Sequence, residues 1–206
     1  MAVVKENVRL ILFDLGGVLV ELADIRDMWC GKKNNCSDEE LWGLWLNNEA
    51  IRAIDRGQIS VDDFLLQWVR DWELEVSVEA LKKIYENLIR QPFPGVMELL
   101  EDCQKKYRLA CLSNMTANHW PKVKSFGLDA YFDYSFISCE MACCKPEAVA
   151  YRKVLENCPY KSEEILFVDD NEVNVREAKV SGMQAIKAKT ALGVRELFED
   201  LGVISA

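Results

Sequence analysis

The stretch VRLILFDLGGVLV, residues 8–20, holds an apolar run that ends in a single carboxylate, Asp14, with Gly16 and Gly17 close behind it. A near-continuous apolar run bounded by turn residues is typical of a strand buried on both faces of a sheet. Glycine lets the chain turn sharply and come close to a ligand, because it carries no side chain. The stretch therefore predicts a buried strand that presents one carboxylate at its carboxyl end.

Four further β-rich runs follow this one, at residues 107–113, 134–138, 165–169 and 184–188. Segments with helical periodicity separate them, such as residues 95–106 and 148–158. Apolar strands that alternate with helices indicate βαβ units, and right-handed crossovers turn these units into a doubly wound α/β fold. In such a Rossmann-like parallel sheet, ligands bind beyond the carboxyl ends of the strands.

Between the first two strands lies an insert, residues 21–91, that contains no strand-like run and reads as about four helices. Ser37 with Glu40 and Ser60 with Asp63 have the spacing of helix starts. We expect a core made of residues 1–20 and 92–206, with residues 21–91 as a separate helical unit. Five of the six tryptophans lie in the insert, at positions 29, 42, 45, 68 and 72. They are expected to form its own small core, the alternative being a wall that faces a ligand.

The composition excludes several classes of partner. The formal charge is −9 with no basic cluster, which argues against a nucleic-acid surface. No apolar run approaches the roughly 20 residues of a membrane helix, and the first ten residues lack the features of a signal peptide. Eight cysteines without C-x-x-C spacing, and one histidine, indicate free thiols in a reducing compartment. We therefore expect a cytoplasmic protein, monomeric or homodimeric; a redox or metal-sensing role for the pair Cys143–Cys144 is the alternative for those two residues.

Polar residues gather at the predicted strand ends. Asp14 ends the first strand, Ser113 and Asn114 follow the second, Lys145 follows the third, and Asp169 and Asp170 end the fourth. The topology brings all of them to one edge of the sheet. Acidic groups, a lysine and a small hydroxyl on one rim can attack, neutralise and hold a phosphoryl group.

The segments FDLGGVLV, LSNMT, KPE and FVDDNEVN resemble, in order, the four motifs of the haloacid dehalogenase superfamily. The resemblance extends from about residue 8 to 201. It is greatest to the small phosphatases that resemble bacterial glucose-1-phosphate phosphatases and the N-terminal phosphatase domain of soluble epoxide hydrolases. The helical insert stands where that family carries its cap domain.

The resemblance implies that Asp14 is the nucleophile and forms a phosphoaspartyl intermediate. It further implies a Mg²⁺ ion bound by Asp14, by the Gly16 backbone carbonyl and by Asp170. Asp169 would lie beside the ion as a ligand or an orienting group, and Asn174 would hold the surrounding residues in place.

Three more residues acquire roles from the resemblance. Ser113 and the backbone amide of Asn114 would bind the phosphoryl oxygens of the substrate. Lys145 would neutralise the charge of those oxygens and keep Asp14 ionised.

Gly16 departs from the family pattern. Most phosphatases of the superfamily have a second aspartate at this position, which acts as general acid and then as general base. Glycine also occurs there in some members near the glucose-1-phosphate phosphatases. His119, six residues after Ser113, is a possible catalytic substitute. The alternative, a surface histidine or one that contacts the cap, is favoured.

Three functions follow from these observations. The first is a Mg²⁺-dependent phosphatase for a small phosphorylated metabolite, which includes sugar phosphates, with no nucleic-acid or membrane partner. The second is a metal-independent 2-haloacid dehalogenase, and the third is a non-catalytic binding or regulatory protein. The adjacent Asp169 and Asp170 favour the phosphatase, because two extra acids would repel a carboxylate substrate in the absence of a cation.

Overall fold

The computed structural model describes residues 7–205, and its centre is a five-stranded parallel sheet of order β5-β4-β1-β6-β7. Residues 1–6, which belong to the expected core, and residue 206 lie outside the described part. The strands are β1 (Leu10–Phe13), β4 (Arg108–Ser113), β5 (Tyr134–Ile137), β6 (Ile165–Asp169) and β7 (Gln184–Lys187). All five predicted strands are present. The chain winds outward from β1 first to one side and then to the other, so the predicted doubly wound α/β fold is confirmed.

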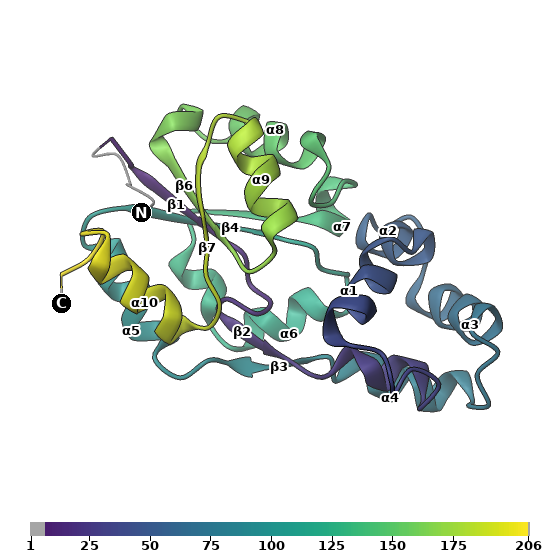
Figure 1. The fold of residues 1–206 in the computed structure, drawn as a ribbon. Coiled ribbons are helices and arrows are strands. Elements are labelled where there is room, and N and C mark those ends of the chain that lie inside the picture. Colours follow the sequence, from purple (N-terminus) through teal and green to yellow (C-terminus); the bar gives the residue numbers. More distant parts are fainter. Residues whose placement is uncertain (1–6, 206) are drawn as a thin grey trace.

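Helices cover both faces of the sheet (Figure 1). Five of them pack on the sheet: α5 (Val96–Gln104), α6 (His119–Ser125) and α10 (Ala191–Asp200) on one face, α8 (Ala148–Asn157) and α9 (Glu172–Val180) on the other. Short elements complete the core, namely α7 (Ser138–Met141), η2 (Leu128–Tyr131) and η3 (Ser162–Glu164). Side chains of β1 alternate between the two apolar clusters, Ile11 and Phe13 in one and Leu10 and Leu12 in the other. Both faces of the sheet are therefore buried under apolar side chains, which explains why the sequences of the strands are continuous apolar runs.

Residues 23–88 form the cap, a helical layer at one end of the sheet (Figure 1). Its helices are η1 (Ile25–Trp29), α1 (Asp38–Leu46), α2 (Glu49–Asp55), α3 (Val61–Asp71) and α4 (Val78–Glu86). The predicted helix starts are present, since Ser37 forms a capping box with Glu40 and Ser60 accepts a hydrogen bond from the Asp63 amide.

The tryptophans of the cap form its own core, as expected. Trp29 and Trp68 are fully buried, and their rings meet edge-on with centroids 5.1 Å apart. Trp45 and Trp72 pack against the same apolar cluster, whereas Trp42 is exposed. The cap therefore has an apolar cluster distinct from the two clusters of the sheet.

The expectation of no strand in residues 21–91 is wrong. The ends of the insert pair as two antiparallel strands, β2 (Val20–Leu22) and β3 (Ile89–Pro92), which connect the core to the cap (Figure 1). The run Ile89–Pro92 has little apolar character, and its strand conformation comes from pairing with a segment almost 70 residues earlier. Such pairing leaves no local signal in the sequence.

None of the helices within residues 7–205 has the length and apolar character needed to cross a membrane.

Candidate active site

Asp14 stands at the carboxyl edge of the sheet, directly after β1. Because Phe13 pairs with Val168 of β6, Asp14 lies level with Asp169. Oδ1 of Asp14 accepts a hydrogen bond from the Leu15 amide at 2.7 Å. Asp14 is only 8% exposed, and this burial, together with Asp169 and Asp170, raises the pKa of its carboxyl to about 7 even though Lys145 opposes the rise. A nucleophilic role at neutral pH therefore needs positive charge nearby.

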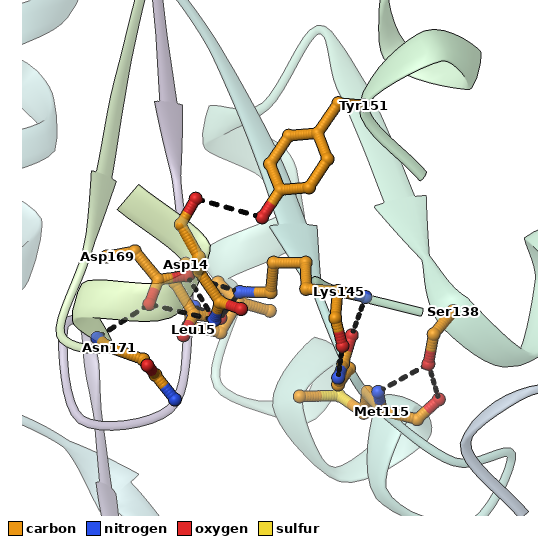
Figure 2. Close-up of polar contacts among 10 residues, drawn as sticks. Asp14, Leu15, Met115, Ser138, Lys145, Tyr151, Asp169 and Asn171 are labelled. Atoms are coloured by element: carbon orange, nitrogen blue, oxygen red, sulfur yellow. Dashed lines mark hydrogen bonds and ion pairs between the residues drawn. The ribbon is translucent and has the colours of Figure 1, made fainter. Parts of the chain in front are cut away.

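Lys145 supplies that charge. Its ammonium Nζ lies 2.9 Å from Oδ1 of Asp14 and 2.7 Å from Oδ2 of Asp169 (Figure 2). Burial alone would lower the pKa of Lys145, but Asp14 and Asp169 raise it above its ordinary value. Lys145 is thus a permanent cation enclosed between two carboxylates.

The Asn114 side chain holds the backbone of Lys145. Its Oδ1 accepts a hydrogen bond from the Lys145 amide at 2.8 Å, and its Nδ2 donates to the Lys145 carbonyl at 2.9 Å. From the sequence, a role is expected only for the backbone amide of Asn114. Asparagine at this place is informative because it alone among small residues combines a donor and an acceptor that match a peptide group.

Asp169 is fully buried, and its carboxylate is saturated with hydrogen bonds. Oδ1 accepts from the Asn171 amide at 2.8 Å, and Asn174 Nδ2 donates to both oxygens at 3.0 and 3.1 Å. With Lys145 on Oδ2, little capacity for a metal is left. Of the two roles considered for Asp169, the geometry favours the orienting one, with Asn174 as its support.

Asp170 completes a cluster of three carboxylates. Asp14, Asp169 and Asp170 each offer an oxygen within 4.8 Å of the others. Burial, and next the proximity of Asp169, raise the pKa of Asp170. Within residues 7–205 no hydrogen bond reaches the Gly16 carbonyl oxygen. Carboxylates together with a free carbonyl are the hard oxygen donors that suit Mg²⁺.

The two glycines differ in their roles. Gly17 has a φ of +75°, and a Cβ there would lie 2.7 Å from Oδ2 of Asp170. Position 17 therefore needs glycine, in agreement with the sharp turn predicted after the first strand. Gly16 does not adopt a left-handed conformation, and a Cβ there would meet only the Leu22 side chain, at 3.2 Å.

Ser113 is buried at the carboxyl end of β4, on the same edge as Asp14. The loop that follows is tied to α7, because the Ser138 hydroxyl accepts from the Met115 amide at 2.8 Å and donates to the Met115 carbonyl at 3.2 Å (Figure 2). These bonds hold the backbone beside Ser113 and Asn114 in place.

His119 is buried against the cap rather than pointing freely to the rim. Its Nε2 donates to the Tyr85 carbonyl at 2.9 Å, and the two rings lie 4.6 Å apart. Burial lowers the pKa of His119. The structure therefore favours the cap-contact alternative for this residue.

A cavity of about 130 Å³ lies between the cap and the core, beside Lys145. Its lining includes Arg52 and Asp55 from the cap and Asn114, Lys145, Pro146 and Glu147 from the core. Sequence reasoning missed Asp55. Its position at the end of a helix, ahead of an Arg-Gly turn, gave no hint of the distant Lys145. Larger hollows lie elsewhere, and the one of about 700 Å³ opens at the opposite edge of the sheet, around Arg9 and Arg108.

A family model for haloacid dehalogenase-like hydrolases matches residues 8–182. The chain belongs to this family. The hydrolase is also 37% identical over 71 residues to bifunctional epoxide hydrolase 2 of Rattus norvegicus, a match that covers 34% of this chain. That segment spans only 13% of the length of the rat enzyme.

Solved structures share the fold of the hydrolase over nearly its whole length. The HAD family enzyme bt-2542 of Bacteroides thetaiotaomicron has a TM-score of 0.75 at 24% identity, covering 93% of this chain and 98% of that one. Its asp12ala mutant, in complex with magnesium and inorganic phosphate, has a TM-score of 0.73 at 25% identity, covering 93% and 99%. The L-2-haloacid dehalogenase of Xanthobacter autotrophicus has a TM-score of 0.63 at 21% identity, covering 88% and 77%.

Proposed function

We propose that this hydrolase is a Mg²⁺-dependent phosphatase that acts on a small phosphorylated metabolite, such as a sugar phosphate, in the cytoplasm. The observation that carries the proposal is the buried ammonium of Lys145 between Asp14 and Asp169, with Asp170 alongside. The eight free thiols support the cytoplasmic setting.

Asp14 is the proposed nucleophile. Oδ1 is fixed by the Leu15 amide and by Lys145, so the carboxylate keeps one orientation. Attack on phosphorus would form an Asp14–phosphoryl bond while the bond to the substrate oxygen breaks. Water would then hydrolyse the phosphoaspartyl group, releasing phosphate and restoring Asp14.

Asp14, Asp170 and the Gly16 carbonyl would hold the Mg²⁺ ion, and Asp169 and Asn174 would orient the site around it. The ion would supply charge neutralisation for the phosphoryl oxygens and for the acids around them. The crystallisation of bt-2542 with magnesium and inorganic phosphate supports this assignment.

Ser113, the Asn114 amide and Lys145 would bind the phosphoryl oxygens. All three are at the edge of the sheet where Asp14 ends β1. Hydrogen-bond donors and a fixed cation at that place match the charge that a transferring phosphoryl group carries.

Dehalogenation is the second candidate, because an L-2-haloacid dehalogenase shares the fold. Three carboxylates within 4.8 Å argue against it, since Asp14 and Asp169 already engage Lys145, and an organic carboxylate substrate without a metal ion would be repelled by the remaining negative charge. The contact between Asp14 and Lys145 argues against a non-catalytic protein.

The test measures phosphate release from p-nitrophenyl phosphate and a hexose 1-phosphate, with Mg²⁺ and then with EDTA. We expect turnover that EDTA removes, that Asp14→Asn abolishes and that Asp200→Asn, an exposed control, leaves unchanged. Halide release from a 2-chloro acid that persists in EDTA would establish the dehalogenase instead. No turnover of either kind would favour the binding protein.

A further inference from the structure

Asp55 brings a carboxyl group from the cap to the cavity beside Lys145. It is the last residue of α2 and lines the same cavity as Lys145 and Asn114. Among residues 7–205 its carboxyl group has no hydrogen-bond partner and no cation within 4.0 Å. A carboxyl group without a partner at a ligand cavity is available to a ligand.

The arginines beside Asp55 are directed to other acids. Arg56 donates through Nε to Oε1 of Glu147 at 3.0 Å. Arg52 pairs with Glu49, with 4.0 Å between Nη1 and Oε1. Among the described residues, neither guanidinium therefore forms an ion pair with Asp55, although both are close to it in the sequence.

Lys145, the cation across the cavity, is likewise held by Asp14 and Asp169. Burial raises the pKa of Asp55 to about 7, and the attraction of Lys145 and Arg56 only limits this rise. A carboxyl group of this kind is partly protonated at neutral pH, which is the state that an acid catalyst needs.

We propose that Asp55 protonates the leaving group of the substrate, and so supplies from the cap the acid that is missing at Gly16. This inference rests on the proposed phosphatase function.

The position of Asp55 suits the geometry of phosphoryl transfer. The attacking and leaving oxygens lie roughly in line on opposite sides of phosphorus. With Asp14 at the edge of the sheet, the leaving oxygen faces away from the sheet, toward the cap. The turn after Asp55 is pressed on the core, since a Cβ at Gly57 would lie 2.9 Å from the Cys139 carbonyl oxygen. Asp55 is therefore held against the core.

The two steps balance in atoms and charge. As Asp14 bonds to phosphorus and the phosphorus–oxygen ester bond breaks, the Asp55 carboxylic acid gives its proton to the departing alkoxide, and an alcohol leaves. In the second step the Asp55 carboxylate takes a proton from the water that attacks the phosphoaspartyl group. Inorganic phosphate leaves, and both aspartates return to their starting states.

The test compares Asp55→Asn with Asp71→Asn, a change at an exposed position of the same cap. For a simple alkyl phosphate with Mg²⁺, we expect Asp55→Asn to lower kcat/KM by roughly 10²–10⁴. For p-nitrophenyl phosphate, whose leaving group needs no proton, kcat/KM should fall less than about tenfold. Asp71→Asn should match the wild type on both esters. An equal loss of kcat/KM on the two esters, or no loss at all, would overturn the proposal.

A second readout separates proton transfer from a purely structural role. Without Asp55 as base, hydrolysis of the phosphoaspartyl group should become slow, so Asp55→Asn should release p-nitrophenol in a stoichiometric burst before a slow steady state. A folded variant without a burst contradicts the proposal. If Asp55→Asn does not fold, the wild type decides: a steep preference of kcat/KM for the aryl ester would show that no acid acts.

The failure of this inference differs from failure of the proposed function. A wild-type protein that hydrolyses neither ester, or an active Asp14→Asn variant, refutes the phosphatase. A wild type that depends on Asp14 and Mg²⁺, combined with an Asp55→Asn variant that discriminates no leaving groups, refutes only the role of Asp55.

Discussion

At the scale of single residues, the site depends on a buried lysine, Lys145, beside three carboxylates. Lys145 contacts two of them, and Asp169 is fully buried. A buried ion pair adds little to stability compared with an apolar pair, but the removal of one partner leaves the other charge without compensation.

We therefore predict that Lys145→Met destabilises the fold by about 3–5 kcal/mol, in addition to abolishing activity. The free energy of unfolding, measured with urea at pH 7, checks this. Lys187→Met is the control, because Lys187 is half exposed and lies 3.9 Å from its partner Glu172. Equal stability of the two variants would mean that Lys145 is not the counter-charge of the buried acids.

Gly16 offers a second prediction at this scale. Its backbone is not left-handed, and only the flexible Leu22 side chain would have to move for a Cβ. In the Asp55→Asn background, Gly16→Asp should restore alkyl phosphate turnover by roughly 10² or more, because it returns an acid to the site. In the wild type the same change should gain little, since Asp55 already gives the proton. A large gain in both backgrounds would show that wild-type Asp55 does not act as the acid.

Much of the site could be predicted from the sequence, because strand ends are local features. Asp14, Ser113, Lys145, Asp169 and Asp170 each follow a β-rich run or its loop, and the structure brings them to one edge. Asp55 and the Asn114 side chain could not be predicted in the same way. Their roles depend on contacts between segments that are distant in the sequence, and the neighbouring residues in the sequence do not indicate these contacts.

At the scale of elements, several contacts join the cap to the core. Arg56 binds Glu147 beside the cavity, and Tyr85 of α4 meets His119 of α6 on the other side. The paired strands β2 and β3 join the two parts. The ion pair between Arg56 and Glu147 thus links cap and core at a place separate from the β2–β3 connection.

We predict that Arg56→Gln favours the open cap. The ion pair is partly exposed, so it contributes roughly 0.2–1 kcal/mol and shifts the equilibrium up to about fivefold. KM should rise by a similar factor, and limited proteolysis near residues 20–22 and 89–92 should accelerate. Arg70→Gln, at an exposed position of α3, is the control. An unchanged KM and cleavage rate would exclude a role for this ion pair in closure.

At the scale of the whole molecule, the formal charge of the chain is −9, and three of its carboxylates cluster beside Lys145, with Lys189 Nζ 3.9 Å from Oδ2 of Asp170. A divalent cation bound there would stabilise the folded state by mass action. We predict that Mg²⁺ at about 100 times its Kd adds about 2.7 kcal/mol to the free energy of unfolding. Thermal unfolding with and without Mg²⁺, at constant ionic strength, measures the gain. Asp170→Asn should remove most of it, and an undiminished gain would place the ion elsewhere.

The fold as a whole could be predicted further than its connections. Five strands and the helices between them were predicted from apolar periodicity, because each buries residues at fixed local spacings. The pair β2 and β3 could not be predicted, since only one of the four residues of Ile89–Pro92 is buried. β3 pairs with β2 because the chain returns from the cap to the core at this point, and this pairing exists only in the folded chain.

The central position of β1 has a consequence for hydrogen exchange. The amide of Asp14 donates to the Val168 carbonyl at 2.8 Å, and every residue of β1 is fully buried between two neighbouring strands. Such amides exchange with deuterium only when the whole domain unfolds, whereas a peripheral layer can exchange through partial opening. The proposed nucleophile, Asp14, and the proposed acid, Asp55, therefore belong to regions of different protection. Deuterium should enter the backbone around Asp55 long before it enters Leu10–Asp14. One of the two proposed catalytic residues then lies in the slowest-exchanging part of the molecule, and the other lies in a part that can open by itself.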